Sequence, residues 1–287
     1  MLEFSTFAVI GLVAGCMYAL IALGLVFVYR SAGVINFGVA GFATLAGFSF
    51  ASVYDDGGRS YWLALAVAVG VGVLAGAASE RLVIRELLDQ GTTSASVGTL
   101  AAVAVTLASI TVFWAPNPRR IPPSFSAKGV NLGDLVVTYH QIAAMALTAV
   151  LCVVVWALLD RTRHGRALRC MAESRQTAML MGIPIRRYDA VLWAAAGGLA
   201  ALAGVVIAPQ TGMNPGAYTV VLVKALAAAM VGRLVNPWLA VAGGLVLGFL
   251  EAMVTWQLPQ YVGLRDVLMF LTIGAALLLT ERQRTVA

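Results

Sequence analysis

Residues 7–29 have the sequence FAVIGLVAGCMYALIALGLVFVY, which contains no charged side chain. A helix needs about 20 mainly apolar residues to cross roughly 30 Å of hydrocarbon, so this stretch is long enough to span a bilayer. Comparable apolar runs recur along the chain, at 34–53, 62–78, 96–114, 141–159, 190–208, 238–256 and 264–279. The pattern predicts an all-α, polytopic membrane protein whose eight or nine membrane segments form one bundle and one domain, 1–287.

The composition agrees with this class. Of the 287 residues, 61% are hydrophobic and only 11% are charged, and the mean hydropathy is +0.90. Soluble proteins carry about 25% charged residues, so a soluble fold is excluded. The net charge of +6 does not indicate nucleic-acid binding, because most basic residues lie between apolar runs, where the positive-inside rule accounts for them.

The number of crossings depends on the short run 218–231, which contains Lys224. It is predicted to be a broken helix, a re-entrant segment or a tilted short crossing. With the N-terminus outside, nine crossings place 13 arginines inside and 5 basic residues outside, whereas eight crossings give 11 and 7. Nine crossings fit the positive-inside rule better. The proline-rich loop 115–139 is then outside, as an irregular cap.

Several kinds of catalytic chemistry have no sequence motif here. Lys128 and Lys224 are the only lysines, and neither completes the GxxxxGK[ST] loop that binds nucleotide phosphates. The only histidines, His140 and His164, form no HExxH zinc motif. The three cysteines form no CxxC pair, and no serine lies in GxSxG. We therefore expect no catalytic residues, no metal site and no enzyme activity, and an energy source outside this chain.

Small residues four positions apart recur within the runs and favour a tightly packed bundle, because they let helix backbones approach closely in lipid. The pairs are Gly11/Gly15, Gly72/Gly76, Gly197/Ala201 and Gly244/Gly248.

Four blocks carry a resemblance to a known family. They are GCMYALIALGLVF (15–27), VINFGVAGFATLAGF (34–48), HGRALRCMAESRQTAMLMGIPIRRYDAVLWAAAGGLAALAGVV (164–206) and GGLVLGFLEAMV (243–254). In this order they resemble the LivH-type permease of branched-chain amino-acid ABC importers, over nearly the whole chain.

The resemblance implies a permease that works as half of a transmembrane heterodimer with a related permease. Two separate ATP-binding subunits would use the ATP, an extracytoplasmic solute-binding protein would deliver the solute, and this chain would bind no cofactor. The protein would reside in the bacterial inner or plasma membrane as a multi-pass protein, surrounded by lipid. The solute would be a branched-chain amino acid or a related small polar molecule such as urea or a short amide. An ATP-independent channel or secondary carrier is the alternative.

The segment 160–189 is predicted to be the cytoplasmic coupling loop, because it carries seven arginines. Gly165 can open a helix there and Gly182 can close it in the left-handed conformation. An apolar face would come from Leu168, Met171, Ala172, Met179 and Leu180. By the resemblance, Gln176-Thr177-Ala178 followed by Gly182 matches the spacing of the permease helix that docks in an ATPase groove. The residues expected to couple to the ATPase are Gly165, Arg166, Arg169, Glu173, Gln176, Ala178 and Gly182, with Arg169 and Glu173 spaced to pair. A loop that is basic only to fix topology is the alternative.

Four polar residues within the apolar runs are candidates for the translocation pathway. Glu251 is a mid-span carboxylate, which indicates a function by default but can also be protonated or paired with Lys224. Asn36 is either a pathway or helix-break residue, or a cap that bonds a neighbouring helix. Thr99 and Thr106 lie seven apart on one helix face and either line a polar path or bond back to their own helix.

Overall fold

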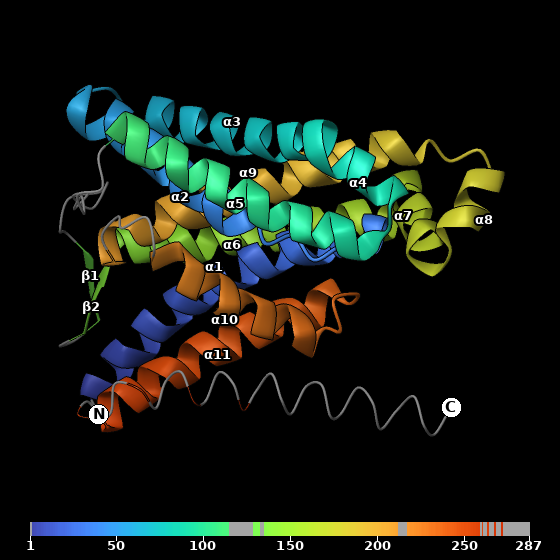
Figure 1. Cartoon of the computed structure of the whole chain (residues 1–287). Helices are drawn as coiled ribbons and strands as arrows, with labels where there is room; N and C mark the ends of the chain where they lie inside the picture. The colour runs from blue at the N-terminus through green and yellow to red at the C-terminus, as the bar shows by residue number, and fades with distance from the viewer. Residues whose placement is uncertain are drawn as a thin grey trace, which may run out of the picture.

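A computed structural model describes residues 2–114, 129–132, 135–211 and 217–258, together with residues 260, 263, 267 and 271. Almost all of the described chain is helical (Figure 1). The elements are α1 (Leu2–Ala32), α2 (Val39–Ala51), the π-helix η1 (Ser52–Asp56), α3 (Tyr61–Ser79), the π-helix η2 (Glu80–Ile84), α4 (Arg85–Asp89), α5 (Thr92–Trp114), β1 (Gly129–Leu132), β2 (Leu135–Thr138), α6 (Tyr139–Arg161), α7 (Arg163–Glu173), α8 (Arg175–Leu180), α9 (Ile185–Thr211), α10 (Ala217–Val231) and α11 (Pro237–Gln257). The expected all-α membrane class is confirmed.

Six helices of the described chain are long and apolar enough to cross a membrane. They are α1, the continuous helix formed by α3, η2 and α4, and helices α5, α6, α9 and α11. Each of them contains one of the apolar runs predicted from the sequence, and the helices extend a few residues beyond those runs.

Two expected spans form shorter helices. At 1.5 Å per residue the 13 residues of α2 reach about 20 Å before the helix continues into the five residues of η1, and the 15 residues of α10 reach about 22 Å, short of the hydrocarbon thickness. Helix α2 is also buried along nearly its whole length, so protein and not lipid surrounds it. The expected last span, 264–279, lies outside the described residues apart from positions 267 and 271. The number of eight or nine segments therefore stays a prediction.

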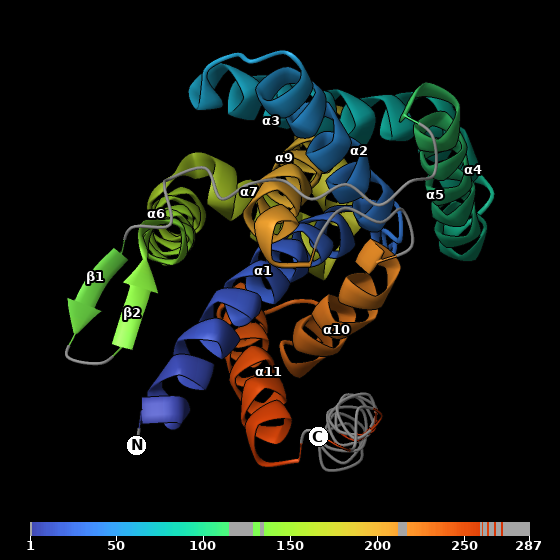
Figure 2. The same ribbon diagram turned by 90° about the vertical axis from the view of Figure 1, so that its left-hand side faces the viewer.

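Helix α1 runs through the centre of the bundle and crosses α11 at two glycine pairs (Figure 2). A Cβ atom on Gly15 would lie 2.8 Å from the Leu245 Cα, and one on Gly248 would lie 2.3 Å from the Gly15 nitrogen. Gly11 and Gly244 meet the opposite backbone just as closely. The two small-residue motifs seen in the sequence are therefore the two sides of one crossing, at which any side chain would push the helices apart.

Helices α3 and α9 cross in the same way. A Cβ atom on Gly72 would lie 2.5 Å from the Gly197 carbonyl oxygen and 2.6 Å from the Ala201 Cβ. One on Gly76 would lie 2.2 Å from the Trp193 carbonyl oxygen. All four small-residue pairs in the sequence thus meet in two helix crossings, which join α1 to α11 and α3 to α9.

The two ends of the bundle differ. Helices α7 and α8 project from one end, and the strands β1 and β2 lie at the other, near the N-terminus (Figure 1). The strands pair antiparallel, with Val130 opposite Val137. The part of the 115–139 loop that is described therefore forms a hairpin and not the irregular cap expected from its prolines. Residues 115–128 lie outside the described part.

Candidate functional site

The predicted coupling segment forms two short helices and not the single helix expected between Gly165 and Gly182. Helix α7 ends at Glu173, and Ser174 both breaks the helix and caps α8, its hydroxyl accepting from the Thr177 N–H at 3.2 Å. Gly182 closes α8 as predicted, with φ +76°. The Gly182 N–H bonds the Met179 carbonyl at 2.9 Å and the Ile183 N–H bonds the Ala178 carbonyl at 3.1 Å, which is the Schellman pattern.

Helix α7 is held against the end of α6 by close backbone contact. A Cβ atom on Gly165 would lie 1.9 Å from the Leu159 carbonyl oxygen, so only glycine fits this position. The helix itself begins two residues earlier, at Arg163. Arg169 strengthens the same junction, because its Nη1 donates to the Leu159 carbonyl at 2.9 Å and to the Asp160 carboxylate at 3.2 Å. The pairing of Arg169 with Glu173 that the spacing suggested does not form.

Arg175 ties α8 to the membrane helices. Its guanidinium forms a two-pronged ion pair with Asp189 of α9, with one nitrogen–oxygen distance of 3.3 Å, and also donates to the Ser31 carbonyl at the end of α1. The Asp189 side chain is only 2% exposed, whereas that of Arg175 is 34% exposed. A bidentate arginine–carboxylate pair fixes orientation as well as distance. No sequence pattern had predicted this clamp.

The apolar residues of the segment divide into two faces. Leu168, Met171 and Ala178 are buried against the bundle, and Ala178 is completely inaccessible. Met179, Leu180 and Met181 point away from it, with exposed fractions of 56%, 89% and 70%. We call these three residues the α8 tip. Of the remaining predicted coupling residues, Arg166, Glu173 and Gln176 are exposed. Ala178 therefore anchors the segment and the α8 tip is the surface it presents.

Within the bundle, Glu251 contacts residues from two other helices. Its carboxylate is ion-paired with Lys224 of α10 and accepts a hydrogen bond of 2.7 Å from the Tyr18 hydroxyl of α1. The Lys224 ammonium also lies 5.8 Å from the centre of the Tyr18 ring. The two charged side chains are 15% and 21% exposed. The two charges therefore stabilise each other near the middle of their helices, and the predicted pairing of Glu251 with Lys224 forms. A role of Glu251 in the translocation pathway stays a prediction.

Asn36 lies in the helix break between α1 and α2 and is fully buried. Its Oδ1 accepts from the Gly38 N–H at 2.9 Å, and its Nδ2 has no hydrogen-bond partner among the described residues. Thr99 of α5 braces the same break, because its hydroxyl accepts from the Phe37 N–H at 3.1 Å and lies 3.3 Å from the Ile35 carbonyl. The same hydroxyl also bonds back to the Ser96 carbonyl of its own helix at 2.7 Å, as the back-bonding alternative expected. The structure therefore brings Asn36 and Thr99 to one break in the backbone.

Thr106 lies two turns further along α5 and is buried against α2. Its hydroxyl bonds back to the Ala102 and Val103 carbonyls of its own helix, at 2.9 and 2.8 Å. A Cβ atom on Gly41 would lie only 2.0 Å from this hydroxyl, so the threonine is packed directly on the glycine. Thr106 takes the back-bonded arrangement that is common for threonines in membrane helices.

Comparison with known proteins identifies the family to which this helical bundle belongs. The family model of the branched-chain amino acid transport system permease component matches residues 7–277, almost the whole chain. The chain belongs to this permease family. As a member of it, the permease is a multi-pass protein of the cell membrane, and its relatives are components of transport systems.

Individual relatives show how far the likeness goes. The chain is 26% identical to the probable branched-chain amino acid transport permease protein LivH of Methanocaldococcus jannaschii, over 86% of this chain and 80% of that one. It is 28% identical to the guanosine ABC transporter permease protein NupQ of Bacillus subtilis, over 60% and 58%. The fold is similar to PsaBC from Streptococcus pneumoniae, solved in complex with Fab, with a TM-score of 0.52, 15% identity and 97% and 91% coverage. The family model thus establishes the family of this chain, and the relatives are named for different solutes.

Proposed function

We propose that the chain is the transmembrane permease subunit of an ABC importer, and that α7 and α8 form its docking site for a separate ATPase. The observation that carries this proposal is the α8 tip. Three consecutive large apolar side chains face away from the bundle at the end of a helix that is itself outside the spans. Such a group is costly in water, and it suits insertion of a short helix into an apolar groove on a partner.

The anchoring of the segment supports the same role. A docking helix transmits force only if it moves with the membrane helices, and α8 is joined to α9 and α1 through Arg175. Helix α7 is joined to α6 through Gly165 and Arg169. ATP binding by the partner would then shift the equilibrium between inward- and outward-facing bundles through these contacts. A loop that is basic only to fix topology needs neither the clamp nor the exposed tip.

We further propose that the solute is a branched-chain amino acid or a related small polar molecule, with Glu251, Asn36 and Thr99 near its path. The name of NupQ keeps nucleosides among the related solutes. An extracytoplasmic binding protein would make most of the selection, and a second, related permease would complete the transmembrane pair. Uptake of leucine and of guanosine into proteoliposomes, each with its binding protein, separates the two solute classes.

Replacement of Leu180 by aspartate tests the docking proposal. Because Leu180 is 89% exposed, Leu180→Asp leaves the bundle folded, and the charge prevents entry into an apolar groove. The purified complex should lose its ATPase subunits or its solute-stimulated ATP hydrolysis, while the membrane part stays monodisperse in detergent. Leu180→Met is the matched control, since it keeps the apolar surface and should couple normally.

Gly182→Val extends this test to the α8 cap, because a β-branched residue resists φ +76°. Normal transport and normal ATPase binding by both Leu180→Asp and Gly182→Val would contradict the assignment. An ATP-independent channel or carrier would then explain the data better.

A further inference from the structure

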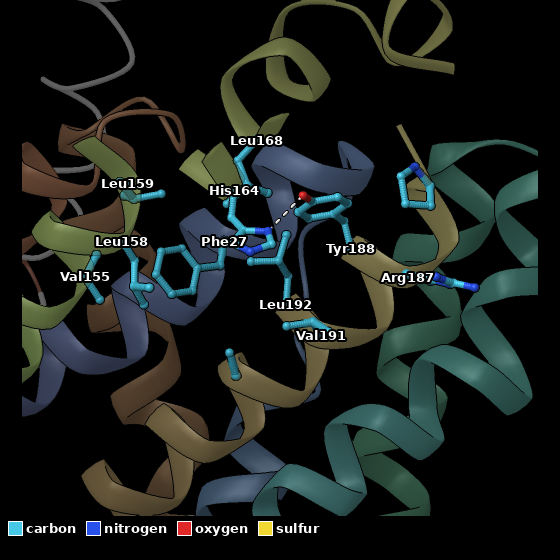
Figure 3. Close-up of a pocket in the computed structure, with 12 residues that line it drawn as sticks. Phe27, Val155, Leu158, Leu159, His164, Leu168, Arg187, Tyr188, Val191 and Leu192 are labelled. Atoms are coloured by element: carbon cyan, nitrogen blue, oxygen red, sulfur yellow. Dashed lines mark hydrogen bonds between the residues drawn. The ribbon is translucent and has the colours of Figure 1, made fainter. Parts of the chain in front are cut away.

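A cavity of about 490 Å³ opens beside the junction of α6, α7 and α9 (Figure 3). Its walls are mainly aliphatic and aromatic, and three polar residues, His164, Arg187 and Tyr188, complete the lining. The apolar lining residues are Phe27, Val155, Leu158, Leu159, Leu168, Pro184, Val191, Leu192 and Ala195. We propose that this cavity binds one acyl chain of an anionic phospholipid, with the headgroup at the polar end.

Polar lining residues occur near the α7 end of the cavity, where Leu168 also lines it, and the lining residues further along α9 are apolar. Figure 3 shows His164 and Tyr188 facing each other, joined by a hydrogen bond of 3.0 Å between Nδ1 and the hydroxyl, with Val191 and Leu192 further along α9. The polar residues adjoin the α7 end of the bundle, and Ala195 lies about two turns deeper along α9. An amphipathic ligand with one polar end and one long apolar end fits this gradient.

Part of the cavity wall is exposed on the outer side of membrane-spanning helices. Leu158 is 51% exposed and Val191 is 65% exposed, and each lies on a membrane-spanning helix. Helix α6 is poorly covered by the rest of the protein, since only 22% of its apolar 18-residue stretch is buried. An opening on this face, unlike one inside the bundle, is reached by lipid without any change in protein conformation.

Arginines lie around the polar end of the cavity and favour an anionic lipid. Arg187 is a lining residue whose side chain extends away from His164 and Tyr188 (Figure 3), and Arg163 precedes the lining residue His164 in the sequence. The Arg161 guanidinium lies 4.5 Å from the centre of the Trp156 ring. All three arginines are exposed. Basic residues at the membrane surface attract anionic lipids, which the cytoplasmic leaflet supplies if the seven arginines of this loop are inside.

The size of the cavity also argues for a single chain and against a protein helix. An α-helix with side chains is about 10–12 Å across, so about 490 Å³ would hold only about one helical turn. A lipid tail is much narrower and can follow the groove along α9. The inference does not depend on which solute the permease carries or on whether α8 docks an ATPase.

Native mass spectrometry of the purified protein, loaded with phosphatidylglycerol or phosphatidylcholine, tests the site. The wild type should retain phosphatidylglycerol in preference to phosphatidylcholine. Arg187→Gln should lower phosphatidylglycerol retention by about fivefold, the share expected of one basic residue near the membrane surface. Arg186→Gln is the matched control, because Arg186 is exposed, adjacent and outside the cavity lining, and it should retain lipid as the wild type does.

A second pair of variants tests the apolar part. Val191→Trp fills the cavity and should reduce retention of both lipids, whereas Val153→Trp, on an equally exposed valine of α6 outside the lining, should not. Equal retention of the two lipids by the wild type, or equal effects of the lining and control variants, would overturn the proposal. So would efficient cross-linking of position 191 to a second permease, since a protein would then occupy the groove.

Discussion

Two ion pairs each join consecutive helices of this permease, and they differ in their surroundings and in the kind of helix that they connect. Arg175–Asp189 joins an extramembrane helix to a spanning helix and buries one partner almost completely. Lys224–Glu251 joins α10 to α11 in mid-bundle, with both partners partly accessible. The first pair fixes the position of α8 relative to α9 and α1. The second places a balanced pair of charges where membrane proteins usually keep charges only for a function.

Arg175→Gln should have the largest effect, because it leaves the Asp189 carboxylate buried without its counter-charge. Breaking a buried pair from one side costs about 3–5 kcal/mol, so the thermal midpoint of the purified permease should fall clearly. Transport should fall with it, since α8 also loses its bond to the Ser31 carbonyl. The double variant Arg175→Gln, Asp189→Asn removes both charges and should recover much of the stability. If the single variant is as stable as the wild type, the Arg175–Asp189 pair contributes nothing to the stability of the permease.

Glu251→Gln should act mainly on transport. The amide keeps the shape and can still accept from Tyr18, but Lys224 loses its counter-charge at mid-membrane depth. We expect uptake in proteoliposomes to fall roughly tenfold or more, a barrier change of about 1.4 kcal/mol, with protein level close to wild type. Uptake at the wild-type rate would reduce the pair to a structural contact.

The charge-exchanged variant, Lys224→Glu with Glu251→Lys, makes this distinction directly. A purely structural pair tolerates exchange, so both stability and uptake would return. A pair that also faces the solute has a fixed polarity, and then stability would return without uptake. We expect the second result, and restored uptake would contradict a pathway role.

Sequence patterns predicted the spanning helices well, because length and hydropathy decide insertion in a bilayer. They also found both halves of each glycine crossing, although spacing alone does not tell which motif meets which. The short helices were harder. Hydropathy marks 34–53 as a span, but the break at Asn36 delays the helix until α2, which is buried by α3, α5 and α9 around it.

Only part of the candidate site was predicted from the sequence, and the reason is physical. Gly182 was found because left-handed closure of a helix demands a specific residue. The Ser174 break and the Arg175–Asp189 clamp were missed, since the partners are 14 residues apart and meet only because the chain turns back after α8. Leu168 and Leu180 were assigned to one apolar face, which the structure divides between core and surface. The one usable signal was Asp189, an acid placed just before a long apolar run.

Among these variants, Asp160→Asn should have the smallest effect on stability and transport, because its ion pair is the most exposed. Asp160 pairs with Arg169 at 3.2 Å, but the two side chains are 43% and 44% exposed, and exposed pairs contribute about 0–1 kcal/mol. Arg169 also keeps its 2.9 Å bond to the Leu159 carbonyl, which by itself holds α7 against α6. Thermal midpoint and solute-stimulated ATP hydrolysis should therefore stay near wild type, and any difference should vanish at high salt, which screens exposed charges. A large loss of coupling would show that Arg169 acts through this carboxylate and not through the backbone contact.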